Sequence, residues 1–579
     1  MEVAQQETLT QAAEKQAVEM TGSAAVLEAL IAEGVNTIFG YPGGAIMPIY
    51  DALYDYTDKL EHILVRHEQG GIHAAQGFAR TSGKVGVVFA TSGPGATNLV
   101  TGLADAQIDS TPVVCITGQV FAQLLGTDAF QETDVINITT PITKWNYQVT
   151  DATEIPEVLA KAFYIAKSGR PGPVLIDITK NAQVQKFQFK GYTPCNHIRS
   201  YRPKPIVRPQ FIEQAAELIN KAERPFILFG QGVILGGAEQ EFKAFVEKSG
   251  IPAAWTVLGA GAIPSDHPLN VGMLGMHGNY GPNVLTNSCD VLIAIGMRFD
   301  DRVTGRLDKY AKQAKVIHLD IDPAEIDKNV KTTVPVWGDC KETLPLLTAL
   351  VEQKSHPEWL QQFHDHTKEE IDQVIYKELN PETGEMTMGE VIRHLNEITK
   401  GDAVIVTDVG QHQMVGCRYA KFNKTRSNVT SGGLGTMGFA LPAAMGAKYG
   451  AKDREVVAII GDGGFQMTLQ ELGTIMQDNI DIKIIILNNH FLGMVRQWQE
   501  LFNQRRYSFV DMACPDFVKL ASAYGIEGNS VDDRKDLRSA LETMMNHKGP
   551  YLLEVIVTKE NNVFPMVPQG CSVAEIRLK

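Results

Sequence analysis

The sequence is poor in cysteine, in long apolar segments and in net positive charge. Its 579 residues include seven cysteines and no CxxC pair, which excludes a disulfide framework and a thiolate zinc site. No apolar run reaches the ~20 residues of a bilayer-spanning helix, so we expect no membrane association. The acidic first twenty residues resemble neither a secretory signal nor a transit peptide. The expected compartment is therefore the reducing cytoplasm.

A basic surplus is also missing, because 53 Lys and Arg stand against 67 Asp and Glu, a net charge of −14. An acidic chain repels phosphate backbones, so we expect no nucleic-acid partner. Hydrophobic residues, in contrast, make up 44 % of the chain, which is enough for several cores and excludes general disorder. At ~150 residues per domain, the length predicts three to four domains.

Two segments without apolar periodicity divide the chain. Residues 191–209 are rich in proline, and residues 354–387 are strongly polar and partly helical. We interpret both as linkers. The expected units are an N-terminal extension and three domains of ordinary size, at residues 1–20, 21–190, 210–353 and 388–579.

Each of the three domains alternates short Val/Ile runs with helical patterns, as in VVCITG (113–118), VLIAIG (291–296) and KIIIL (483–487). Continuous apolar runs predict strands buried on both faces, and the intervening helices predict parallel pairing. The expected fold class is α/β, with three doubly wound parallel-sheet domains. Such sheets bind ligands at the carboxyl ends of their strands.

Two of these strand ends carry the strongest motif. Gly461-Asp462-Gly463 follows one strand of the third domain, and Asn488-Asn489 ends the next. A carboxylate and an amide oxygen from neighbouring strands suit Mg²⁺, and the glycines let the backbone approach a diphosphate. Either motif alone is a common turn, but the joint pattern predicts a metal–diphosphate site.

The first domain carries a candidate proton-transfer group. Glu68 lies in RHEQGG (66–71), just after a predicted strand, and a glycine-rich strand-to-helix turn lies at TSGPGATN (91–98). A carboxylate beside apolar surface can have a raised pKa and move a proton; the alternative is a solvated surface glutamate. An HExxH zinc motif is excluded because position 71 is glycine.

The middle domain has glycine-rich turns at 230–237, 272–281 and 296–306, followed by HLDID (318–322) and GDC (338–340). Glycine and arginine at several strand ends suit an anionic dinucleotide, although tight turns alone would also explain them.

Two further patterns are ambiguous. A literal GxGxxG at 433–438 is discounted as a nicotinamide motif because TRSNVTSG (425–432) is a poor strand. Met494 and Trp498 share a helix face, and either core packing or a place beside a cofactor accounts for them.

Together these motifs resemble the catalytic subunits of the acetohydroxyacid synthase (acetolactate synthase) family of thiamine-diphosphate enzymes, over roughly residues 21–570. The diphosphate motif marks the whole superfamily, whereas RFDDRVTG, GTDAFQE and Trp498 are more specific. The other matching segments, besides RHEQGG, TSGPGATN and the metal motif, are YPGGA (41–45), GTDAFQE (126–132), SGRPGPV (168–174), GMHG (275–278), RFDDRVTG (298–305), GQHQM (410–414) and GGLGTMG (432–438).

The resemblance implies that pyruvate is decarboxylated and its hydroxyethyl unit is transferred to a second pyruvate or to 2-ketobutyrate. The products would be 2-acetolactate and 2-aceto-2-hydroxybutyrate, on the route to valine, leucine and isoleucine. The implied cofactors are thiamine diphosphate, Mg²⁺ and FAD, the flavin being structural because the reaction has no net redox change. The first domain would bind the pyrimidine, the middle one the flavin and the third the diphosphate. The implied assembly is a homodimer with its sites between subunits, a tetramer being the alternative, with a separate small regulatory subunit.

The resemblance also assigns individual residues. Glu68 would hydrogen-bond the pyrimidine ring, Met437 would separate the two rings of the cofactor, and Trp498 would favour 2-ketobutyrate as acceptor. The catalytic set is Glu68, Gln131, Lys180 and Gly44, and the substrate set is Arg302, Met494 and Trp498. The metal ligands are Asp462, Asn489 and the carbonyl of Phe491. The thiamine set is Glu68, Thr91, Pro94, Asn98, Gly410, Gln411, His412, Gly435, Met437, Gly461, Asp462, Gly463, Gly464 and Asn489. The flavin set is Arg170, Gly230, Gly232, Met276, His277, Arg298, Asp300, Asp320, Ile321 and Asp339.

Some positions depart from the family pattern, namely Phe121-Ala122-Gln123, Phe491 and Gln569. They bear on the substrate channel rather than on the central chemistry. The alternatives within the superfamily are a pyruvate oxidase-like flavoenzyme and a flavin-independent catabolic acetolactate synthase; glyoxylate carboligase is disfavoured by Glu68. Outside it, a nicotinamide dehydrogenase and a non-catalytic binding protein remain alternatives.

Overall fold

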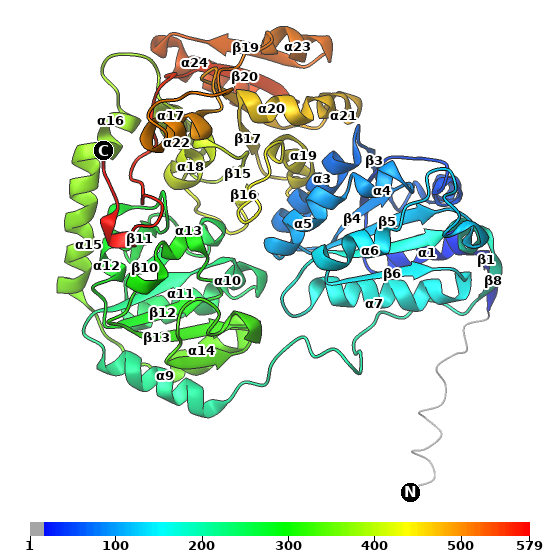
Figure 1. Ribbon diagram of the computed structural model, residues 1–579, viewed down its shortest axis with the longest axis horizontal. Helices are drawn as coiled ribbons and strands as arrows, with labels where there is room; N and C mark the ends of the chain where they lie inside the picture. Colours follow the sequence, from blue (N-terminus) through cyan, green and yellow to red (C-terminus); the bar gives the residue numbers. More distant parts are fainter. Residues whose placement is uncertain (1–16) are drawn as a thin grey trace, which may run out of the picture.

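The computed structural model describes residues 17–579, so most of the predicted N-terminal extension, residues 1–16, lies outside it. The described chain folds around three six-stranded sheets in which every neighbouring pair is parallel. Helices cover both faces of each sheet, as Figure 1 shows. The expectation of three doubly wound α/β domains is confirmed.

The first sheet consists of continuous apolar segments buried on both faces, such as β4 and β5. Helices α1 (Gly22–Ala32) and α7 (Ile155–Lys167) pack on one face, and α3 (Glu68–Ser82) and α5 (Val100–Ile108) on the other. The strand order is β3 (Glu61–Leu64), β2 (Thr37–Gly40), β4 (Gly86–Ala90), β5 (Val113–Gln119), β7 (Val174–Thr179) and β6 (Trp145–Val149). A separate antiparallel pair, β1 (Val18–Thr21) with β8 (Lys186–Phe189), joins the two ends of this domain.

The second sheet is covered by α9 (Pro209–Lys221), α11 (Glu239–Ser249) and α14 (Cys340–Leu350) on one face and by α12 (Tyr280–Thr286) on the other. Its strand order is β11 (Asn270–Met273), β10 (Ala253–Trp255), β9 (Pro225–Phe229), β12 (Val291–Ile295), β13 (Lys315–Asp320) and β14 (Val334–Trp337).

The segment expected to be a linker at 354–387 is partly a structural element of the middle domain. It contains α15 (Pro357–Glu370), which packs beside α12 (Figure 1). Trp359 and Phe363 are buried in the same core as β9, and the Trp359 indole donates a hydrogen bond to the Pro225 carbonyl (2.8 Å). The polar face of an amphipathic helix explains the polar composition of this segment.

The third sheet has the strand order β16 (Asn428–Thr430), β15 (Val404–Thr407), β17 (Val456–Gly461), β18 (Lys483–Asn488), β20 (Tyr551–Ile556) and β19 (Glu527–Val531). Strand β16 corrects the interpretation of residues 425–432, because three residues of this segment pair with β15 at the edge of the sheet. Its pairing depends on a neighbouring strand and not on its own composition.

The third domain shares a core with each of the other two. Helix α19 (Ala440–Gly450) packs on α3, and residues from both sheets form one buried cluster. The opposite face, with α17 (Met388–Thr399) and α24 (Arg534–Asn546), merges with the core of the middle domain. The C-terminal segment then crosses back to the middle domain, where the Val567 amide donates to the Met276 carbonyl (2.8 Å; Figure 1). Between residues 17 and 579, no helix combines the length and apolar character of a membrane span.

Candidate active site

The predicted site residues of the first domain gather at the carboxyl ends of its strands. Gly44 follows β2, Glu68 follows β3, Thr91 follows β4 and Lys180 follows β7 directly. The parallel sheet brings these four turns to one edge, because all of its strands point the same way.

Glu68 is the first residue of α3 and is 8 % exposed. Its Oε2 accepts a hydrogen bond from Asn98 Nδ2 (3.0 Å), at the end of the short helix α4 (Pro94–Thr97). A Cβ at Gly95 would lie 3.2 Å from Glu68 Oε1, so this glycine keeps the second oxygen uncovered. The carboxylate is therefore held by Asn98 through one oxygen, and its other oxygen accepts no hydrogen bond from the described residues.

Lys180 and Gln131 lie against the same turns. Lys180 Nζ donates to the Gly44 carbonyl (3.1 Å) and lies over the Phe121 ring. Gln131 has a left-handed backbone (φ 61°), and its carbonyl would be 2.8 Å from a Cβ at Gly93. All members of the predicted catalytic set thus lie around one strand edge.

The predicted metal ligands of the third domain also converge. Asp462 begins α20 (Asp462–Thr468) after β17, and Asn489 follows the neighbouring strand β18. Both are buried, at 2 % and 4 % exposed. Asn489 Oδ1 accepts from the Phe491 amide (3.1 Å), which holds these two residues in one tight turn. Burial raises the pKa of Asp462 above its ordinary value.

The predicted diphosphate-binding turns lie next to this pair. Gly410 precedes α18 (Gln411–Tyr419), and a Cβ at Gly410 or at Gly461 would lie 2.7 Å from the His412 ring. Both positions therefore require glycine. Burial lowers the pKa of His412 to about 3, so its imidazole is neutral at physiological pH. Asn489 and Gln411 are linked by a 3.4 Å contact from Nδ2 to Oε1.

His490 and Cys514, to which the sequence analysis assigned no role, lie close to Asp462. One donor atom each from Asp462, His490 and Cys514 lies within 4.8 Å of the others. Cys514 Sγ lies 3.5 Å from Asp462 Oδ2, and burial together with Asp462 raises the pKa of this thiol to about 12. The sequence did not predict either residue. His490 follows the Asn-Asn motif like an ordinary turn residue, and Cys514 belongs to no recognisable motif.

A cavity with a volume of about 1030 Å³ lies between the three domains. Nearly the whole predicted flavin set lines it, together with the predicted substrate residues and part of the thiamine set. These residues are Arg170, Gly232, Met276, His277, Arg298, Asp300, Arg302, Asp320, Ile321, Asp339, Gly410, Gly435, Met437, Met494 and Trp498. Gly230 adjoins this wall: a Cβ there would lie 2.4 Å from the Gly296 carbonyl.

The cavity has the features of a dinucleotide site. A Cβ at Gly232 would lie 2.6 Å from the Gly296 Cα, so the turns after β9 and β12 touch through their backbones. His277 Nδ1 is buried without a hydrogen-bond partner, and burial lowers the pKa of this imidazole to about 4. Burial raises the pKa of Asp320 to about 7. An unpaired buried nitrogen beside a large cavity indicates a missing polar partner.

Arg170 links this cavity to the first domain. Its guanidinium pairs with Glu325 (2.6 Å) and Asp322 (3.1 Å), and its Nε donates to Ser110 Oγ (2.9 Å). The guanidinium is therefore held at the cavity wall by three groups from two domains, and the sequence analysis did not foresee these partners.

The substrate candidates occupy one side of the cavity. Arg302 is largely exposed, with Nη1 3.8 Å from Met276 Sδ. Met494 and Trp498 lie on α22 (Gly493–Phe502) and are half-buried, whereas Arg496 on the opposite face is fully buried. The core-packing alternative for Met494 and Trp498 is thus wrong, because both side chains line the cavity.

Within residues 17–579, no hydrogen bond joins the Glu68 group to the Asp462–Asn489 group, and neither group lines the large cavity. The two halves of the predicted thiamine site thus lie at the strand ends of two different sheets, the Glu68 half in the first domain and the Asp462 half in the third.

Comparison with known proteins agrees with this architecture. Three thiamine pyrophosphate enzyme models match the chain: the N-terminal TPP binding domain at residues 20–138, the central domain at 212–347 and the C-terminal TPP binding domain at 408–555. Acetolactate synthase isozyme 2 large subunit of Escherichia coli is 45 % identical over 96 % of this chain and 99 % of its own length. Acetolactate synthase of Mycobacterium bovis is 46 % identical, covering 96 % and 91 %. The large subunit of Parasynechococcus marenigrum is 45 % identical with the same coverage. The chain belongs to the acetolactate synthase large-subunit family of thiamine pyrophosphate enzymes.

Proposed function

We propose that this protein is an acetolactate synthase that condenses two 2-ketoacids with loss of carbon dioxide. One observation carries the proposal: Asp462 and Asn489, both buried, meet at the ends of two neighbouring parallel strands beside the glycine turns of Gly410 and Gly461. That donor set suits Mg²⁺ and a diphosphate. When bound, thiamine diphosphate supplies the electron sink for decarboxylation.

The metal site would use the Asp462 carboxylate, the Asn489 side-chain oxygen and the Phe491 carbonyl. The buried Asp462 fits this role, because a cation would offset the desolvation that now raises its pKa. Met437, whose Cε lies 3.7 Å from the Cβ position of Gly463, would support the ring system from the same side.

The cavity between the domains would hold FAD. The glycine contacts of Gly232 and Gly296, the unpaired His277 nitrogen and the fixed Arg170 guanidinium fit an anionic dinucleotide. The flavin is proposed to be structural, because the condensation has no net redox change. This assignment favours the flavin-dependent family over the flavin-independent catabolic enzyme.

In the reaction, Glu68 would hold or release the proton at a pyrimidine nitrogen through its uncovered Oε1. Lys180, Gln131 and Gly44 would shape the space beside it. Arg302 would bind the carboxylate of the substrate through its guanidinium. Met494 and Trp498 would line the acceptor pocket and favour the larger 2-ketobutyrate by apolar contact.

We further propose a homodimer in which Glu68 of one chain faces Asp462 of the other. The placement of these two groups on two different sheets supports this arrangement. Two almost fully exposed phenylalanines, Phe130 (88 %) and Phe509 (99 %), suit burial between subunits. Because relatives are named large subunits, a separate small chain with a regulatory role is part of the proposal. All seven cysteines are free thiols, which suits the reducing cytoplasm proposed for it.

Product identification tests the proposal. The purified protein is incubated with pyruvate, Mg²⁺, thiamine diphosphate and FAD, and each cofactor is omitted in turn. Acetolactate that requires all three cofactors is the expected result. Acetyl phosphate or acetate with reduction of the flavin would instead assign an oxidase, and activity without FAD would assign the catabolic type.

A further inference from the structure

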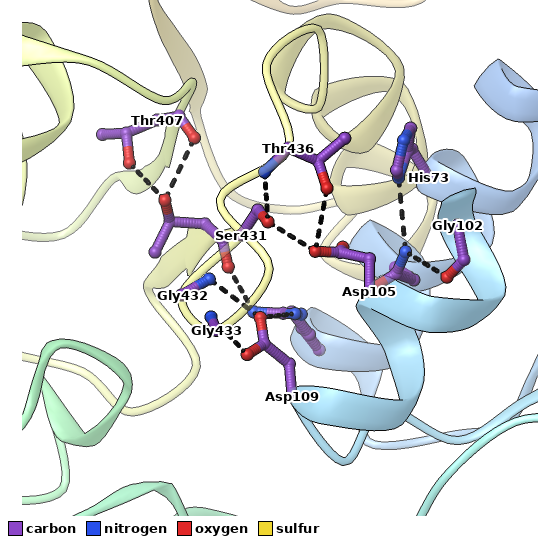
Figure 2. Close-up of polar contacts among 12 residues, drawn as sticks. His73, Gly102, Asp105, Asp109, Thr407, Ser431, Gly432, Gly433 and Thr436 are labelled. Atoms are coloured by element: carbon purple, nitrogen blue, oxygen red, sulfur yellow. Dashed lines mark hydrogen bonds and ion pairs between the residues drawn. The ribbon is translucent and has the colours of Figure 1, made fainter. Parts of the chain in front are cut away.

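A buried polar network connects the first domain to the loop that carries Gly435 and Met437. Figure 2 shows Asp105 and Asp109, at the C-terminal end of α5, facing the loop at residues 431–436. This loop follows β16 and lines the large cavity with several of its residues. The two acidic residues are four positions apart in a helix that is otherwise mostly apolar, and the sequence analysis assigned them no role.

Asp109 holds the start of the loop through its backbone. Its Oδ2 accepts from the Gly432 amide (2.8 Å), and its Oδ1 accepts from the Gly433 amide (2.7 Å). Both carboxylate oxygens are thus occupied by consecutive amides of another domain. A Cβ at Gly433 would lie 2.8 Å from Asp109 Oδ1, so the close approach requires glycine there.

Arg80 completes this anchor from α3. Its Nη2 donates to Asp109 Oδ2 (2.8 Å), and its Nη1 donates to the Thr430 carbonyl (2.5 Å). The side chains of Arg80 and Asp109 are 5 % and 0 % exposed. A buried pair of this kind is costly to form unless further hydrogen bonds support it, and here the Thr430 carbonyl and the amides of Gly432 and Gly433 supply three.

Asp105 holds the far side of the loop through side chains. Its Oδ1 accepts from Ser431 Oγ and from Thr436 Oγ1 (3.3 Å), while Ser431 Oγ accepts from the Thr436 amide (2.9 Å). Residues 431 and 436 are therefore tied to one carboxylate oxygen, which closes the loop into a fixed turn (Figure 2).

We propose that Asp105 and Asp109 are positioning residues that fix the 431–436 loop, and through it the placement of Gly435 and Met437 for thiamine diphosphate. The inference rests on the proposed function, since it assumes that this loop contacts the cofactor. Neither carboxylate lines the large cavity, so each would act through the loop. Charge-assisted hydrogen bonds to backbone amides suit such a role because they are short and directional.

Two variants and one control test the proposal in the full-length protein. Asp109→Asn places an amide donor against an amide or guanidinium donor. Ser431→Ala deletes no charged group; it removes the hydroxyl that joins the Asp105 carboxylate to the Thr436 amide and leaves the direct bond from Thr436 Oγ1 to Asp105. The control is Glu390→Gln, which alters a nearly buried carboxylate paired with Arg534 (2.9 Å) inside the third domain, away from the loop.

The first measurement is hydrogen–deuterium exchange of the peptide at residues 428–440 without thiamine diphosphate. We expect faster exchange in Asp109→Asn and in Ser431→Ala, with the control matching wild type. This readout needs no cofactor and no activity, so it tests the anchor separately from the proposed function. Unchanged exchange in both variants would overturn the proposal.

The second measurement is calorimetric titration of the flavin-loaded proteins with thiamine diphosphate and Mg²⁺. We expect the dissociation constant to rise about tenfold in Asp109→Asn, or ~1.4 kcal/mol, and about threefold in Ser431→Ala. The control should bind like wild type even if its unfolding midpoint falls. Faster exchange with affinities within twofold of wild type would overturn the positioning role, whereas absence of binding by wild type would overturn the proposed function.

Discussion

Glu68 is the residue on which the proposed chemistry most depends. It is buried, it is held through one oxygen by Asn98, and Gly95 leaves its other oxygen uncovered. One carboxylate oxygen thus orients the side chain, and the other is left for the proposed proton transfer. Sequence reasoning found the residue, but the partner that orients it became visible only in the folded turn after β4.

The change Glu68→Gln should remove proton transfer while keeping the shape and most hydrogen bonds of the site. We expect turnover to fall by about 100-fold or more, the range for a general acid–base group, and thiamine diphosphate binding to stay near wild type. Single-turnover kinetics with a parallel binding titration measure both quantities. Activity near wild type would contradict the proton-transfer role.

Trp498 tests acceptor choice, because it lines the cavity beside Met494 and packs on Phe502 with ring centroids 5.0 Å apart. Trp498→Leu should enlarge the acceptor pocket and weaken apolar contact with 2-ketobutyrate. We expect its preference over pyruvate to fall roughly tenfold, the scale of a lost apolar contact. The product ratio in a competition assay is the measurement, with Phe502→Leu as a matched control; an unchanged ratio would reject the role.

At the scale of elements, the contact between α3 and α19 joins the first and third domains. A Cβ at Gly77 would lie 1.9 Å from the Ala443 carbonyl, and one at Gly446 would lie 1.7 Å from the Ala74 carbonyl. The two helices therefore touch backbone to backbone, which places the end of α5 close enough for Asp105 and Asp109 to reach the third domain.

Gly77→Ala should force these helices apart. We expect a loss of about 1–3 kcal/mol in the free energy of unfolding, the usual cost of overpacking, and slower assembly of the domains. Gly71→Ala is the matched control in the same helix, because its Cβ would meet no backbone atom and would lie 3.3 Å from a Val65 methyl group. Urea unfolding compares them; equal midpoints for the two variants would contradict the predicted contact.

For the whole molecule, the Glu68 and Asp462 halves of the thiamine site lie on two different sheets, and the proposed homodimer would bring the Glu68 half of one chain to the Asp462 half of the other. A Glu68→Gln chain and an Asp462→Asn chain should each be inactive. Mixed and reassembled, they should recover about one quarter of wild-type activity, because half of the dimers carry one intact site. No recovery after verified exchange of subunits would place the site within one chain.

The free energy of unfolding should also depend on pH through His73, a buried histidine of α3. Burial, followed by the charge of Arg80, lowers the pKa of His73 to about 3. The unfolded chain binds this proton below pH ~6.5 while the folded chain does not, so stability is present above that pH and is lost as the pH falls. His73→Leu removes this dependence.

We expect wild type to lose about 1 kcal/mol more than His73→Leu between pH ~7.5 and ~5.5. Urea midpoints at the two pH values measure the difference. The other buried histidines are present in both proteins, so their contributions to the pH dependence cancel in the difference. Equal losses in the two proteins would mean that His73 is protonated in the folded state.

The sequence by itself determined the central strands, since continuous Val/Ile runs such as VVCITG and KIIIL are stable only when covered on both faces. It also placed the candidate metal ligands at their ends, because Asp462 and Asn489 directly follow two strands of one sheet. Local spacing is enough for both inferences.

Only the tertiary structure decided the edge strand β16, the packing of α15 and the network of Asp105, Asp109 and Arg80. Each of these depends on partners hundreds of residues away or on a neighbouring strand, and no local pattern encodes such distances. The same holds for Arg170, whose acidic partners Asp322 and Glu325 come from another domain. Side chains that are positioned by a single turn can be predicted from the sequence. Contacts between side chains of two domains can be found only in the folded structure.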